Sequence, residues 1–99
     1  MKKIVERIPD VDYIENVRNA LKEDKHKNIK LTVVSHNKAR YETYEGKILQ
    51  LGYDLMDFEI SRDYLRPNLK EGDKISVKLV DVHSYGTRQQ YHWFRRNRR

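Results

Sequence analysis

The 99-residue chain contains no cysteine, so it forms neither a disulfide framework nor a thiolate metal site. Its only glycines are too far apart to build a phosphate-binding loop: Gly46, Gly52, Gly72 and Gly86. No apolar run approaches the roughly 18 residues that a membrane-spanning helix needs. The first residues, 1–6, are charged too early for a signal peptide. We therefore expect a cytoplasmic protein that does not contact a membrane.

Signatures of catalysis are also missing from the sequence. It contains no nucleophile elbow and no dinucleotide fingerprint. The histidines are dispersed, without the close spacing that is typical of zinc ligands: His26, His36, His83 and His92. We therefore expect no metal, no cofactor and no enzymatic activity.

Acidic residues are absent from residues 87–99, which carry five arginines. Net charge is +6, from 21 basic and 15 acidic residues, so residues 1–86 hold 16 basic and 15 acidic residues and a net charge of only +1. Positive charge that is concentrated at one end of a chain indicates a polyanionic partner. The charged fraction is 36%, against about 25% in ordinary domains. The high charged fraction and the lack of cysteine are typical of proteins from thermophiles, so we expect a thermophilic host or a virus of one. For a viral protein, the expected location is the host cytoplasm.

Hydrophobic periodicity predicts one helix and about five strands. The helix is predicted over residues 11–25, where four apolar residues recur at helical spacing: Val11, Ile14, Val17 and Leu21. Alternation of apolar and polar residues predicts strands over residues 29–35, 40–51, 55–60, 74–82 and 87–94, and a short one over residues 2–8. Gly46 predicts a bend in the second of these, and residues 84–86 predict a turn.

This order of elements predicts an α+β fold, in which one N-terminal helix packs on a curved, mostly antiparallel, barrel-like sheet of about five strands. The length fits one domain. We assign residues 1–94 to that domain and residues 95–99 to a basic C-terminal tail.

Two parts of the chain resemble small β-barrel families. The end of the helix (residues 17–21), the next strand (residues 29–34) and the bent strand Tyr44-Glu45-Gly46-Lys47-Ile48 are similar to the Sm-like fold. Residues 69–82 resemble the "GD-x-V-x-V-K-V" strand of S1-type OB folds. Both families bind nucleic acid, so the resemblance implies a barrel-like fold and nucleic acid, DNA or RNA, as the partner.

The C-terminal segment is the main candidate site, because its arginines can pair with phosphates and its aromatic rings can stack on bases. On a strand, Arg88, Gln90 and His92 share one face, whereas Tyr91 and Trp93 share the other. The predicted nucleic-acid-binding residues are Arg88, Gln90, His92, Arg95, Arg96, Arg98 and Arg99. The predicted function is that of a small, non-enzymatic nucleic-acid-binding protein.

The sequence leaves three alternatives open. The aromatic residues could pack the sheet while the arginines solubilise the chain or bind an acidic protein partner. The chain could also be a structural or regulatory protein-interaction module, such as a homodimer, without a nucleic-acid role. Finally, Glu45-Gly46-Lys47, with Asp24 upstream, resembles part of the PD-(D/E)xK motif, in which carboxylates hold a divalent metal; a metal-dependent nuclease is the minor alternative.

Overall fold

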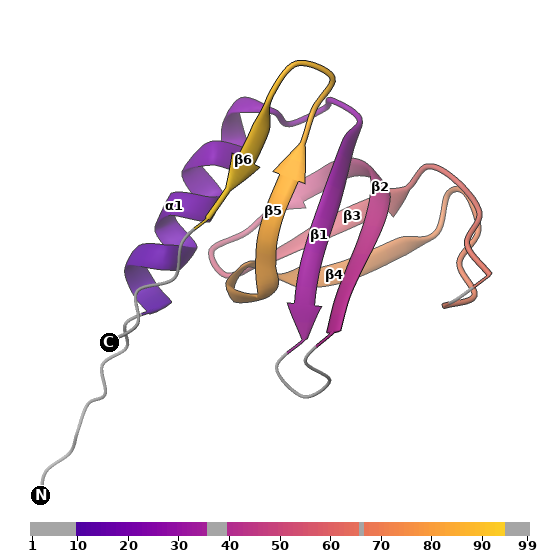
Figure 1. Cartoon of the computed structure of the whole chain (residues 1–99), viewed down its shortest axis with the longest axis horizontal. Helices are drawn as coiled ribbons and strands as arrows, with labels where there is room; N and C mark the ends of the chain where they lie inside the picture. Colours follow the sequence, from indigo (N-terminus) through magenta and orange to yellow (C-terminus); the bar gives the residue numbers. More distant parts are fainter. Residues whose placement is uncertain (1–9, 36–39, 66, 95–99) are drawn as a thin grey trace, which may run out of the picture.

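The computed structural model describes residues 10–35, 40–65 and 67–94, which form one helix and a six-stranded antiparallel sheet (Figure 1). The elements are α1 (Asp10–Glu23), β1 (Ile29–Ser35), β2 (Arg40–Leu51), β3 (Leu55–Ile60), β4 (Lys74–Lys78), the 3₁₀ helix η1 (Leu79–Asp81), β5 (Val82–Gly86) and β6 (Tyr91–Trp93). The strand order is β4-β3-β2-β1-β5-β6. No helix in the described ranges is long and apolar enough to cross a membrane.

The predicted α+β class is therefore confirmed, with two corrections to the sheet. It has six strands rather than five, because residues 82–86, which include the predicted turn over residues 84–86, form a separate strand, β5. It is also open rather than closed: β4 and β6 are its two edges and do not pair with each other among the described residues.

Helix α1 packs on the sheet through an apolar stripe. Tyr13, Val17 and Leu21 are buried along it, whereas Val11, which the sequence pattern had placed on the stripe, is 50% exposed. The hydroxyl of Tyr13 donates to the carbonyl of Val82, which ties the helix to β5. The chain reverses after the helix at His26, whose φ of 74° lies in the left-handed region. This reversal delivers β1 directly into the middle of the sheet.

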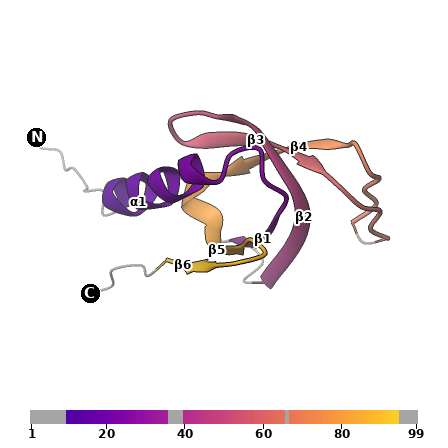
Figure 2. The same ribbon diagram turned by 90° about the horizontal axis from the view of Figure 1, so that it is seen from above.

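Strand β2 connects the two halves of the sheet (Figure 2). It pairs with β1 through residues 40–46 and with β3 through residues 46–51, so that Gly46 faces both neighbours. A Cβ at this position would lie 2.0 Å from the carbonyl oxygen of Glu59. The bend predicted at Gly46 thus coincides with a close approach of two backbones that no other residue type permits.

The core lies between α1 and the concave side of the bent sheet. It draws on the helix and on strands β1 to β5. Its buried residues are Tyr13, Val17, Leu21, Ile29, Leu31, Tyr44, Ile48, Met56, Phe58, Ile60, Val77, Leu79, Val82 and Tyr85.

The chain after Lys78 differs from the prediction. Residues 79–81 form η1, a turn of 3₁₀ helix that ends the regular alternation of β4. Residues 84–86, predicted as a turn, belong to β5, where Tyr85 is fully buried. Of the strand predicted over residues 87–94, only β6 is a strand, and residues 87–90 form the turn before it. The predicted strand over residues 2–8 lies outside the described residues.

Candidate nucleic-acid interface

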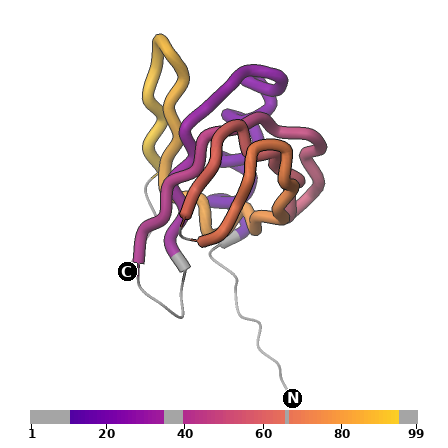
Figure 3. The backbone as a smooth tube through the Cα atoms, turned by 90° about the vertical axis from the view of Figure 1, so that its right-hand side faces the viewer, coloured from indigo at the N-terminus to yellow at the C-terminus, as the bar shows by residue number. Residues whose placement is uncertain are grey.

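The β5–β6 hairpin carries most of the candidate segment and extends beyond the body of the sheet (Figure 3). Thr87 holds its turn: its amide donates to the carbonyl of Gln90 over 2.8 Å, and its Oγ1 accepts from the amides of Gln89 and Gln90 over 3.2 and 3.0 Å. A threonine hydroxyl that closes a turn in this way fixes its backbone locally. Arg88 and Gln89 therefore stand at the exposed tip of an ordered turn.

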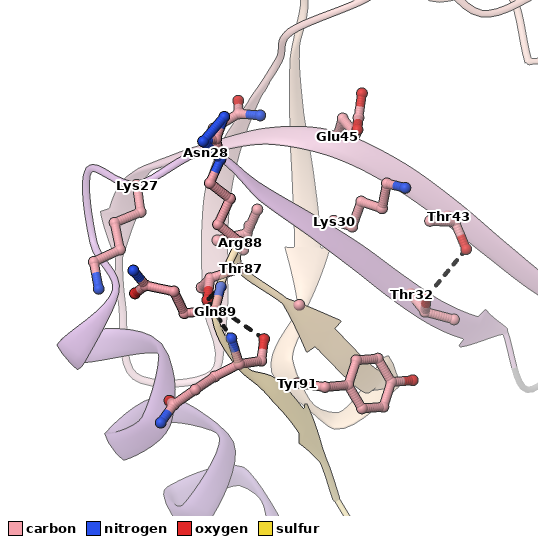
Figure 4. Close-up of a pocket in the computed structure, with 13 residues that line it drawn as sticks. Lys27, Asn28, Lys30, Thr32, Thr43, Glu45, Thr87, Arg88, Gln89 and Tyr91 are labelled. Carbon is pink, nitrogen blue, oxygen red and sulfur yellow. Dashed lines mark hydrogen bonds between the residues drawn. The ribbon is translucent and has the colours of Figure 1, made fainter.

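A surface hollow of about 1060 Å³ lies beside this turn (Figure 4). Its walls come from three places: the loop after α1, the paired strands β1 and β2, and the β5–β6 turn. The lining residues are Lys27, Asn28, Ile29, Lys30, Thr32, Thr43, Glu45, Gly86, Thr87, Arg88, Gln89, Gln90 and Tyr91.

The charged side chains at the hollow differ in whether they form an ion pair with a neighbouring residue. Lys27 pairs with Asp24 over 2.9 Å, and Glu45 pairs with Arg62 over 3.6 Å. Lys30 and Arg88 are both exposed, and neither forms an ion pair with another described residue. The hollow therefore offers two cations that are free to meet an anion, while its acidic member is neutralised by a neighbour.

Tyr91 places an aromatic ring on the sheet surface at the edge of the hollow. It is opposite Gly86 in the β5–β6 register, and a Cβ at Gly86 would lie 3.3 Å from the ring. The hydroxyl of Tyr91 donates to Oγ of Ser84 over 2.8 Å. The ring is thus laid across β5 and anchored at its far end, yet 66% of the residue remains exposed.

We call the side of β1, β2, β5 and β6 that faces away from α1 the outer face (Figure 2). The pairing of β1 with β2 and β5 brings hydroxyl-bearing residues together across the middle of this face. Ser84 is opposite Thr32, and Thr32 is opposite Thr43. The Oγ1 atoms of the two threonines lie 3.0 Å apart. Its members, which alternate with the buried residues of the same strands, are Lys30, Thr32, Tyr41, Thr43, Glu45, Ser84, Gly86, Tyr91 and Trp93.

Two further aromatic rings are exposed on the outer face. Trp93 alternates with Tyr91 on β6 and is 68% exposed, and Tyr41 on β2 is 64% exposed. The ring of Tyr41 meets that of His83 edge-on, with centroids 5.0 Å apart. Three large aromatic residues are therefore exposed on this one face: Tyr41, Tyr91 and Trp93.

His92, one of the predicted site residues, points to the opposite side of β6. Its ring stacks on that of Tyr85, with centroids 4.6 Å apart and an interplanar angle of 14°. Its Nε2 is buried, has no hydrogen-bond partner, and lies 3.7 Å from Oδ2 of Asp24. The structure thus brings Arg88 and Gln90 together at the hollow and separates His92 from them. Arg95, Arg96, Arg98 and Arg99 lie outside the described residues.

Asp24 is a buried carboxylate that joins the end of α1 to β5. The hydroxyl of Tyr85 donates to its Oδ2 over 2.6 Å, and Nζ of Lys27 donates to its Oδ1 over 2.9 Å. Burial alone would raise the pKa of Asp24, but the hydrogen bonds from Tyr85 and Lys27, with the charges of Lys27 and His92, outweigh it and hold the pKa below its ordinary value. Burial and the same carboxylate raise the pKa of the Tyr85 hydroxyl.

The residues proposed for a nuclease have other contacts. Asp24 is held by Tyr85 and Lys27, and Glu45 pairs with Arg62 on the exposed surface. Within residues 10–35, 40–65 and 67–94, no three His, Asp or Glu side chains are grouped so that they could hold a metal ion.

Sequence reasoning missed Lys30, Tyr91 and Trp93 as members of this surface. The two aromatic residues are in the candidate segment but on the face opposite to the one selected. Lys30 is an outward-facing residue between buried Ile29 and Leu31, and its place beside Arg88 depends on a strand pairing that the sequence does not indicate. The chain matches no protein-family model, no curated protein and no solved structure.

Proposed function

We propose that this chain is a small, non-enzymatic nucleic-acid-binding protein that contacts its ligand through the outer face and the adjoining β5–β6 turn. One observation carries the proposal: two cations without ion-pair partners among the described residues, Lys30 and Arg88, border the same hollow as the exposed ring of Tyr91. Cations bind phosphates and release condensed counterions, and rings stack on bases. A surface that offers both fits a nucleic acid better than a purely acidic partner.

Two features of the chain support the same reading. Residues 95–99 contain four arginines and no acid, so the end of the chain adds positive charge that favours a polyanionic ligand. The helix followed by strongly bent antiparallel strands is the arrangement on which the resemblance to Sm-like proteins rests, and that family binds nucleic acid.

Fluorescence anisotropy with labelled oligonucleotides at low salt tests the proposal. The variant Lys30→Glu/Arg88→Glu should weaken binding at least about tenfold, because it replaces two phosphate-binding cations with repelling carboxylates. The matched control is Lys74→Glu/Lys78→Glu, which makes the same change of net charge on exposed residues of the opposite edge strand β4. The control should stay within about twofold of its parent. Equal losses in both variants would mean that net charge, and not this surface, attracts the ligand.

The exposed aromatic surface also favours the second candidate, a protein-interaction module that forms a homodimer. Trp93 is 68% exposed on an edge strand, where a second chain could pair or pack. Size-exclusion chromatography with light scattering distinguishes the two: a dimer that Trp93→Ser converts to a monomer, without any binding of oligonucleotides, favours this candidate.

A further inference from the structure

We propose that the outer face selects single-stranded nucleic acid over duplex, with the ring of Tyr91 as the platform on which an unpaired base stacks. This inference rests on the proposed function and adds the form of the ligand. It follows from three features of the face: the way the Tyr91 ring is held, the spacing of Tyr91 and Trp93, and the scarcity of free cations around them.

The Tyr91 ring is preorganised. Gly86 provides the space beneath it, since a Cβ there would lie 3.3 Å from the ring, and the hydroxyl is fastened to Ser84, which the overlying structure leaves only 1% exposed. A ring held at both ends loses little conformational freedom when a base stacks on its open side. Its 66% exposure leaves that side accessible.

Trp93 provides a second ring on the same side of β6. The backbones of residues two apart on a strand are separated by about 6.6 Å, so the two rings start from neighbouring points of one face. The base faces of an intact duplex are covered by their stacked neighbours, so rings that lie side by side on a sheet cannot stack on them. They fit bases that are already unstacked, as in a flexible single strand.

The cations of this surface are few for a duplex-binding protein. Lys30 and Arg88 are the lining cations without an ion pair among the described residues. A duplex exposes phosphates and base edges but keeps its base faces stacked, so the rings of Tyr91 and Trp93 would gain little from it. A single strand offers phosphates to the cations and base faces to the rings at once.

The test compares a labelled oligo(dT) with a duplex of equal length in the same buffer, using the full chain. Wild type should bind the single strand at least about tenfold more tightly. Tyr91→Ala should lose about tenfold in affinity for the single strand and keep its affinity for duplex within about twofold. Tyr91→Phe, which keeps the ring, should retain most of the binding. Tyr53→Ala, an exposed tyrosine on the β2–β3 turn, is the matched control and should behave as wild type.

An independent measurement needs no variant. Trp93 is the only tryptophan of the chain, so its intrinsic fluorescence reports contact at this position. Oligo(dT) should quench it, and duplex at the same occupancy should not. Equal affinity for both forms, a preference for duplex, or unchanged Trp93 fluorescence on binding oligo(dT) would overturn this inference and leave the proposed function standing. Absence of binding to either form at low salt would overturn both.

Discussion

The hydroxyl of Tyr85 on β5 donates to Oδ2 of Asp24 at the end of α1 over 2.6 Å, a contact between residues 61 positions apart. The same hydroxyl lies 2.9 Å from the carbonyl oxygen of Ala20. On its other side, the Tyr85 ring supports His92 of β6. This one side chain thus links the helix, the sheet and the edge strand that presents Tyr91 and Trp93.

Removing the Tyr85 hydroxyl should destabilise the fold. In Tyr85→Phe, the buried carboxylate of Asp24 loses its donor at Oδ2, and the loss of a hydrogen bond to a charged group costs about 1.5–3 kcal/mol. Urea denaturation followed by circular dichroism measures this change in the free energy of unfolding. Tyr53→Phe, at a residue 72% exposed, should change it by less than about 0.5 kcal/mol. Equal effects at the two positions would contradict this role of Tyr85.

Acid should remove the stability that Asp24 contributes. Because the folded-state pKa of Asp24 lies below its ordinary value of 3.8, the contribution is fully present above pH 3.8 and is lost as the pH falls through the folded-state pKa. The difference in unfolding free energy between wild type and Asp24→Asn should therefore be largest near pH 5 and shrink toward pH 2. Denaturant titrations of both proteins across this interval provide the measurement. A difference that grows toward pH 2 would mean that the folded-state pKa is raised instead.

The sequence predicts the strands best where apolar and polar residues alternate regularly. It predicts them worst where residue types that are common in turns occur within a strand. Strands β1 and β3 have the predicted bounds, because their apolar residues alternate regularly with polar ones. Strand β2 also has the predicted bounds, although its register shifts between Ile48 and Gln50. Strand β5 was predicted in part as a turn, since Ser84 and Gly86 are typical turn residues. These residues form a strand because the Tyr85 ring is buried and its hydroxyl donates a hydrogen bond to Asp24. Both contacts depend on the end of α1, which is distant in the sequence.

Gly46→Ala should be among the most damaging single changes. The new Cβ would be 2.0 Å from the carbonyl oxygen of Glu59 and 2.8 Å from the ring of Phe58, so two paired strands must separate. Overpacking of this kind costs about 3 kcal/mol or more.

Gly72→Ala is the control, because it places a methyl group where no atom lies within 4 Å but at a φ of +96°. It should cost only about 1–2 kcal/mol, from backbone strain alone. The thermal melting temperatures of the two variants give the comparison. A Gly46→Ala protein as stable as Gly72→Ala would show that β2 and β3 do not approach as closely as described.

The salt dependence of binding should separate the contributions of the tail and the sheet. Deleting residues 95–99 removes four arginines, so the slope of log affinity against log salt should become shallower by up to about 3 for a single strand, at about 0.7 per neutralised phosphate. The affinity that remains should still respond to Tyr91→Ala, since the ring is independent of the tail. Anisotropy titrations at several salt concentrations measure both quantities. An unchanged slope would mean that the tail makes no phosphate contact.

The candidate site was only partly accessible to sequence reasoning. Arg88 was found because the arginines of the C-terminal segment are conspicuous. Which face of β6 is exposed depends on the residues that pack against this strand. His92 stacks on Tyr85, so Tyr91 and Trp93 face outward. Lys30 reaches the same surface because β1 pairs with β5, so that Lys30 is opposite Gly86. Such non-local pairing is not encoded in the pattern of either strand alone.

The most direct test of the central claim is to map the contact by nuclear magnetic resonance, titrating the ¹⁵N-labelled full chain with oligo(dT). Amide shifts should concentrate at Lys30, Thr32, Ser84, Arg88 and Tyr91, and β4 (Lys74–Lys78) should be unaffected. Shifts confined to β4, or spread evenly over the sheet, would contradict the assignment of the outer face as the nucleic-acid interface.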